Sequence, residues 1–167
     1  RGLKPSIQRI FLTSEKPVGL IVASLDHSQM AELYVVRSEL EGLAARLAAR
    51  HATIEEKRVL QDMVNDDYKI VDDPSALSRA NRRFHKQIHL ASHNRFLVQQ
   101  LDLVHRSMAL MATTSLAADG RGEVALAEHQ EIVDAIMHGH EDKADDCLRQ
   151  HISIAFSTRL KLLADGD

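Results

Sequence analysis

The stretch D-P-S-A-L-S-R-A-N-R-R-F-H-K-Q-I-H-L-A-S, residues 73–92, has the pattern that decides the fold. Asp73 can cap a helix, and Pro74 stands at the first helical position, where its missing N–H does no harm. Phe84 and Ile88 lie four residues apart and therefore share one face of that helix. No proline follows Pro74 in the sequence, so long uninterrupted helices are allowed from here onward. The stretch predicts one long helix and favours an all-α fold.

The apolar spacing elsewhere predicts five more helices. Thr53 and Glu56 match the Ser/Thr-x-x-Glu capping box, Asn94 offers another cap, and Asp26 or Ser28 can cap the first helix. We expect helices over about residues 28–50, 53–70, 74–92, 94–112, 124–138 and 142–163. Together they indicate an antiparallel bundle of about six helices joined by short turns.

The apolar positions also predict which residues of each helix point inward. In the first helix they include Val36 and Leu43, and in the fourth the inner face begins with Phe96. Gly120 and Gly122 break the chain ahead of the fifth helix.

Residues 1–25 do not share the helical pattern. They hold two of the three prolines and two of the seven glycines, and the apolar period is broken there. We therefore predict a short non-helical arm over 1–25 and a helical domain over 26–167.

Composition narrows the class of protein. The net charge is −3 with histidines neutral, and the 21 basic residues are dispersed, so no electrostatic footprint for nucleic acid is evident. No apolar run is long enough to span a bilayer and no signal peptide is recognisable, which favours a soluble cytoplasmic protein without membrane contact. A single cysteine, Cys147, excludes an internal disulfide and any Cys-rich zinc site. Histidine and oxygen ligands are then the route to a metal.

Three of the ten histidines fall beside or on predicted apolar stripes, namely His85, His129 and His151. Asn81 stands four residues before His85, close enough on a helix for both side chains to reach one ion. His89 shares the same spacing with His85, so spacing alone does not select a pair. Burying an imidazole without partners costs about 1–3 kcal/mol, and three such rings need one shared explanation.

A divalent cation bound by Asn81, His85, His129 and His151 supplies that explanation. Neutral imidazole nitrogens and an amide oxygen suit zinc, nickel or copper better than calcium or magnesium. Joint burial of the histidines in the core without a metal is the alternative.

Several longer motifs point to a known family. They are V-R-S-E-L-E-G-L-A-A-R-L-A-A at 36–49, N-R-R-F-H at 81–85, A-S-H-N-R-F-L at 91–97, E-H-Q-E-I-V-D-A-I at 128–136, H-E-D-K-A at 140–144 and L-R-Q-H at 148–151. In this order and spacing the chain resembles the effector-binding FCD domain of FadR-type GntR transcription regulators, over about residues 25–163.

The resemblance implies a bundle of six or seven helices that encloses a small-molecule pocket, often with a metal on its floor held by Asp or Asn and three histidines. Carried over by position, these ligands are Asn81, His85, His129 and His151, and the ion is zinc or nickel. The family more often has Asp at the first position. Asn81 leaves an all-neutral ligand set, and hence a full positive charge for an anionic effector to meet.

The resemblance also implies partners. We expect a homodimer and a small organic acid as effector, with Arg37 as the first candidate for its carboxylate and Arg106 as the second. Surface ion pairing is the alternative role for both arginines. R-G-L-K-P at 1–5 and V-G-L-I-V-A-S-L-D at 18–26 are similar to the two ends of the family's winged helix-turn-helix. Too few residues separate them for three helices, so operator DNA is expected to be read only through a reader domain missing from this chain.

Two other functions compete with effector sensing. A metal with open coordination positions can activate water in an enzyme. No motif places a carboxylate beside the site as a base, so we expect no enzyme. A purely structural, metal-stabilised dimerisation bundle is the third hypothesis, and it predicts that removing the metal unfolds the protein.

Overall fold

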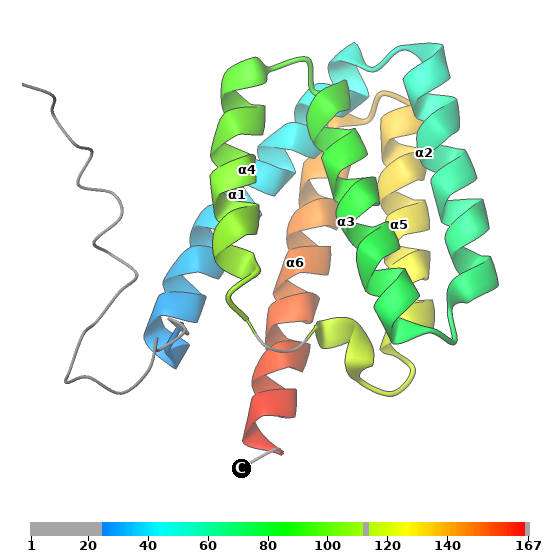
Figure 1. Ribbon diagram of the computed structural model, residues 1–167. Coiled ribbons are helices and arrows are strands. Elements are labelled where there is room, and N and C mark those ends of the chain that lie inside the picture. Colours follow the sequence, from blue (N-terminus) through cyan, green and yellow to red (C-terminus); the bar gives the residue numbers. More distant parts are fainter. Residues whose placement is uncertain (1–24, 112–113, 166–167) are drawn as a thin grey trace, which may run out of the picture.

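The computed structural model describes residues 25–111 and 114–165 as one helical bundle (Figure 1). Its helices are α1 (His27–His51), α2 (Ile54–Asp67), α3 (Pro74–Ala91), α4 (Arg95–Met108), α5 (Arg121–Met137) and α6 (Glu141–Ala164), with short 3-10 helices η2 (Tyr68–Ile70) and η3 (Ser115–Ala117). Within these residues there is no strand, so the all-α prediction is confirmed. The arm predicted over 1–25 lies, except for its last residue, outside the described residues.

Local capping sets where the helices begin. Asp26 caps α1 by accepting a hydrogen bond from the Gln29 backbone N–H at 2.8 Å. Thr53 and Glu56 form the predicted capping box, with Thr53 Oγ1 accepting from Glu56 N–H at 3.2 Å. Asn94 Oδ1 caps α4 in the same way. Each cap satisfies backbone donors that the first helical turn leaves without an intrahelical partner.

The start of α5 differs from the prediction. The helix begins at Arg121 rather than near residue 124, because only Gly120 interrupts the chain, with φ of 66° at the N-cap. Gly122 is a buried helical residue. A Cβ there would lie 3.0 Å from Leu77 Cδ2 and 3.2 Å from the Val71 carbonyl oxygen. Glycine at this position therefore allows α5 to approach the segment that contains Val71 and Leu77. The earlier start brings Arg121 into the bundle.

Small residues let the two longest helices pack closely. Ala44, Ala45 and Ala48 on α1 are fully buried, and α1 makes its most extensive contacts with α6. In Figure 1, α1 rises from the lower left and passes behind α4, α6 lies in the middle, and α3, α5 and α2 lie toward the right. One apolar cluster contains residues from each of the six α-helices, and Phe84 and Ile88 of α3 are among its fully buried members. No helix in the described part combines the length and apolarity needed to cross a membrane.

The inward faces of α1 and α4 differ from the prediction. Val36, Leu43 and Phe96 were expected inside, yet they are 49%, 38% and 72% exposed. The buried face of α1 carries Arg37 and Glu41 instead. Polar side chains can occupy such positions because other helices supply their hydrogen-bond partners, which an apolar pattern does not reveal.

Candidate functional site

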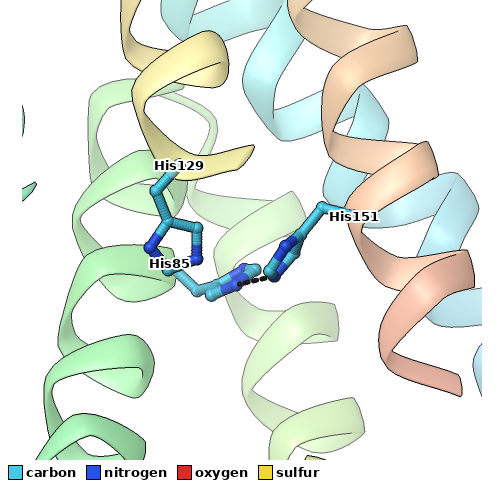
Figure 2. Close-up of side chains that lie close together, drawn as sticks. All are labelled: His85, His129 and His151. Atoms are coloured by element: carbon cyan, nitrogen blue, oxygen red, sulfur yellow. Dashed lines mark hydrogen bonds between the residues drawn. The ribbon is translucent and has the colours of Figure 1, made fainter. Parts of the chain in front are cut away.

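Three imidazoles from three helices meet in the centre of the bundle (Figure 2). His85 projects from α3, His129 from α5 and His151 from α6, and one ring nitrogen of each lies within 4.8 Å of the others. The Nε2 atoms of His85 and His151 are 3.3 Å apart. All three rings are buried, so the structure brings together the histidines that the sequence singled out.

These rings are neutral near neutral pH. Burial lowers the pKa of all three, and repulsion from one another and from Arg121 adds to the effect at His129 and His151, whose pKa values lie well below the usual range. A neutral imidazole offers a lone pair, which is the form that binds a metal. Phe84 stacks on the His129 ring with centroids 4.1 Å apart and so holds it in place.

Two carboxylates fix which nitrogens face the centre. His85 Nδ1–H donates to Glu41 Oε2 at 2.9 Å, and His151 Nδ1–H donates to Glu128 Oε2 at 2.6 Å. With the proton on Nδ1, each Nε2 presents a lone pair toward the other. Two lone pairs at 3.3 Å repel each other unless a cation or an additional proton lies between them. This carboxylate–histidine arrangement is typical of metal ligands.

Unsatisfied buried atoms test whether the residues fit a metal. Neither ring nitrogen of His129 has a hydrogen-bond partner in the described part of the chain, and the same holds for Asn81 Oδ1. Asn81 lies one turn before His85 on α3. Leaving such groups unpaired costs about 1–3 kcal/mol each. A donor set of one amide oxygen and three imidazole nitrogens therefore fits a divalent cation.

Glu41 connects this group to a second set of histidines. Its fully buried carboxylate accepts from His89 Nε2 at 2.9 Å, from His105 Nε2 at 3.0 Å and from Arg37 Nε at 3.3 Å, besides His85. Burial alone would raise the pKa of the Glu41 carboxyl. The neighbouring histidines lower this pKa by more than burial raises it, so the pKa lies well below the usual range of glutamate. Glu41 is thus ionised and fully hydrogen-bonded.

A cavity of about 840 Å³ opens beside the histidines. Asn81 and His151 line it, so an ion held by these residues would be within reach of a ligand in the cavity. Arg37 also lines the cavity, and its Nε–H donates a hydrogen bond to Glu41 Oε1. Arg106 is exposed on α4 and is not among the lining residues, so the structure does not bring it to the site.

The sequence patterns did not identify three residues of the site, which are Glu41, Glu128 and Arg121. Glu41 and Glu128 both stand inside the quoted motifs, Glu41 four residues after Arg37 and Glu128 directly before His129. The i, i+4 spacing of Arg37 and Glu41 was an available signal for an ion pair. The sequence does not reveal Arg121, because the expected break at Gly122 places this residue ahead of the helix, whereas Arg121 is the first residue of α5.

Comparisons with known proteins agree with the geometry. The model of the FCD domain family matches residues 32–153. The HTH-type transcriptional regulator YdhC of Bacillus subtilis is 27% identical over 142 residues, covering 83% of this chain and 62% of its own. The galactonate operon transcriptional repressor of Escherichia coli is 30% identical over 126 residues, which cover 74% of this chain and 54% of that repressor. The chain thus spans less than two thirds of the length of these relatives.

A solved structure shares the fold. The metal-free FCD domain of TM0439 superposes with a TM-score of 0.68 at 19% identity, over 85% of this chain and 99% of that one.

Proposed function

The chain belongs to the FCD domain family of GntR-type transcription regulators, and from this premise we propose that it senses a small carboxylate metabolite at a metal-containing pocket. Its relatives are named as transcriptional regulators, not enzymes. One relative is named for the operon of galactonate, which is itself a carboxylate. The chain would change its packing when the metabolite binds and so control DNA binding.

The metal is assigned to Asn81, His85, His129 and His151. The observation that carries this assignment is His129, a buried imidazole with both nitrogens unsatisfied among the described residues and two other imidazoles beside it. Zinc or nickel suits this ligand set. When bound, the ion supplies a positive charge and open coordination positions for a carboxylate oxygen.

Arg37 is assigned to the carboxylate of the effector. It is buried, lines the cavity and is held in place by Glu41 and by the Tyr34 ring, whose centroid lies 5.6 Å from its guanidinium carbon. Its Nε–H is given to Glu41, which leaves the terminal NH₂ groups to form charge-assisted hydrogen bonds with a carboxylate. Arg106 was the second candidate, and its position outside the cavity favours Arg37.

The proposed regulation depends on which helices carry Arg37 and the metal ligands. The carboxylate would contact α1 through Arg37 while the metal ligands belong to α3, α5 and α6, so binding would favour one arrangement of these helices. We propose that a homodimer carries this change to a winged helix-turn-helix, which alone contacts operator DNA.

Calorimetry with acetate and butyrate tests the sensing function. We expect binding to zinc-loaded protein, none after the metal is removed by a chelator, and at least tenfold weaker binding in Arg37→Met. Arg106→Met is the matched control and should bind as the wild type does. Binding that persists without metal, or that is as tight in Arg37→Met as in the wild type, would contradict the proposal.

The structural-bundle hypothesis makes a different prediction for the same samples. If the metal only holds the fold together, chelation should unfold the protein, as circular dichroism would show. Under our proposal the stripped protein keeps its helices and loses carboxylate affinity.

A further inference from the structure

Arg121 is the least satisfied charged residue of the cavity wall. It is the first residue of α5, is 5% exposed, and lines the cavity. Its Nη2 donates to Glu128 Oε2 at 2.7 Å. Its Nε and Nη1 are buried and make no hydrogen bond to any described residue.

This arrangement is costly for the protein alone. Arginine is almost never fully buried unless it is paired, and each unsatisfied buried donor destabilises the fold. Glu128 does not satisfy the whole guanidinium, because its Oε2 accepts from both Arg121 Nη2 and His151 Nδ1, while its Oε1 is buried without a hydrogen-bond partner among the described residues. Two nitrogens of Arg121 therefore remain available for an acceptor that enters the cavity.

The side chains that line the cavity are cationic or neutral. The lining side chains include five arginines. Arg37, Arg121 and Arg159 are buried, whereas Arg79 and Arg82 are exposed at the rim. Arg37 and Arg121 pair with Glu41 and Glu128, which do not line the cavity. No described lining residue is Asp or Glu, although the whole chain has a net charge of −3. A metal ion beside the cavity would add two more positive charges. The wall is thus built for a ligand with more than one negative charge.

The backbone around Arg121 adds to this preference. Arg121 stands at the N-terminus of α5, a helix of 17 residues, and its N-cap Gly120 has no side chain to satisfy the first backbone N–H groups. The helix dipole places partial positive charge at this end. The guanidinium of Arg121 extends toward Glu128, seven residues further along α5, so the guanidinium and the helix terminus are separate sources of positive potential.

We propose that the effector carries two anionic groups, one carboxylate at the metal and Arg37 and a second group, carboxylate or phosphate, held by Arg121. This inference rests on the proposed function, since it assumes that the first carboxylate binds as described. It adds that the ligand must reach α5 as well as α1. Doubly charged acids would then be selected over singly charged acids of the same length.

Matched probes of equal chain length test this selection by calorimetry on zinc-loaded protein. The four-carbon pair is butyrate and succinate, with 3-phosphonopropionate carrying a phosphonate in place of one carboxylate, and five- and six-carbon pairs cover longer spans. We expect at least one dianion to bind about tenfold or more tightly than its monoanion. The tighter of succinate and phosphonopropionate identifies the second group as carboxylate or phosphate.

Variants assign the preference to Arg121. In Arg121→Met the dianion should lose its advantage over butyrate, measured as the ratio of the two affinities within the variant, because any change that reaches the metal ligand His151 through Glu128 affects both probes. Arg121→Lys keeps a charge for Glu128 and protects the fold, yet it offers a single nitrogen and should also lose most of the preference. Arg79→Met is the control, because Arg79 lies on the exposed rim and donates Nη1 to Ser75 Oγ at 2.9 Å. It should keep the preference.

The outcomes separate this inference from the proposed function. Monoanions that bind as tightly as dianions, or a preference that survives in both Arg121 variants, would overturn the inference and leave carboxylate sensing intact. Failure of every probe to bind metal-loaded protein would overturn carboxylate sensing itself, and the inference with it.

Discussion

Glu41 Oε2 lies 2.9 Å from His85 Nδ1, and both side chains are completely buried. This hydrogen bond fixes the proton on Nδ1 and turns Nε2 of His85 toward His129 and His151. The same carboxylate binds His89, His105 and Arg37, so one acidic residue on α1 orients groups on α3 and α4. Glu41 is therefore the residue that joins the arginine of the cavity to the metal ligands.

The first prediction concerns this carboxylate. Glu41→Gln keeps the shape of the side chain but removes the charge that holds the His85 ring, so zinc affinity should fall about 10- to 100-fold. Competition with a metal indicator dye measures the change. Glu39→Gln is the matched control, because Glu39 is an exposed residue of the same helix that pairs with Arg149. Equal zinc affinity in both variants would show that Glu41 does not orient the ligand.

The second prediction contrasts two of the histidines. His129→Leu replaces a buried ring that has no hydrogen-bond partner among the described residues, so the metal-free protein should gain about 1 kcal/mol in unfolding free energy. His85→Leu removes a donor from buried Glu41 and should cost about 1–3 kcal/mol. Both variants should lose zinc. Urea unfolding of metal-stripped protein checks the signs, and destabilisation by His129→Leu would argue that its ring is satisfied without a metal.

The third prediction is the pH dependence of the metal-free protein. The folded state holds the pKa values of His85, His129 and His151 below 6.5, while the unfolded chain binds protons on these rings near that value. The unfolded state thus takes up more protons, and unfolding free energy falls as pH drops below about 6.5. The lowered pKa of Glu41 also contributes to the unfolding free energy. This contribution is present above pH 4.5 and is lost only in stronger acid.

Urea unfolding at pH 7.5, 6.5 and 5.5 measures this slope. His129→Leu should show a shallower slope than the wild type because one of the titrating rings is gone. Identical slopes would mean that His129 does not titrate with a lowered pKa.

The fourth prediction concerns the two glycines before and inside α5. Gly122→Ala places a methyl group 3.0 Å from Leu77 Cδ2 and should destabilise by about 1–3 kcal/mol. Gly120→Asn is the matched substitution. A Cβ at residue 120 meets no atom within 4 Å, and asparagine tolerates the positive φ of 66°, so the cost should be smaller. Thermal unfolding compares the two, and an equal loss would contradict close packing at Gly122.

The helices could be predicted well because their signals are local. Thr53, Asp73 and Asn94 cap neighbouring backbone groups, and the stripe of α5 with His129 at its centre is buried as expected. The structure also brings His85, His129 and His151 together, while their role as metal ligands stays a prediction.

What could not be predicted depends on contacts between helices. The α1 face was misassigned because burial of Arg37 and Glu41 requires partners from α3 and α4, which the α1 sequence does not contain. Arg121 was missed for a related reason, since the role of Gly122 is set by Leu77 and Val71 rather than by its own neighbours in sequence.

Elemental analysis of protein purified without a histidine tag tests the central claim most directly. We expect about one equivalent of a divalent metal in the wild type and in His138→Ala, an exposed histidine at the end of α5, and its loss in His129→Ala and His151→Ala. A wild type without metal after zinc or nickel is supplied, or full metal content in either buried variant, would contradict the three-helix metal site.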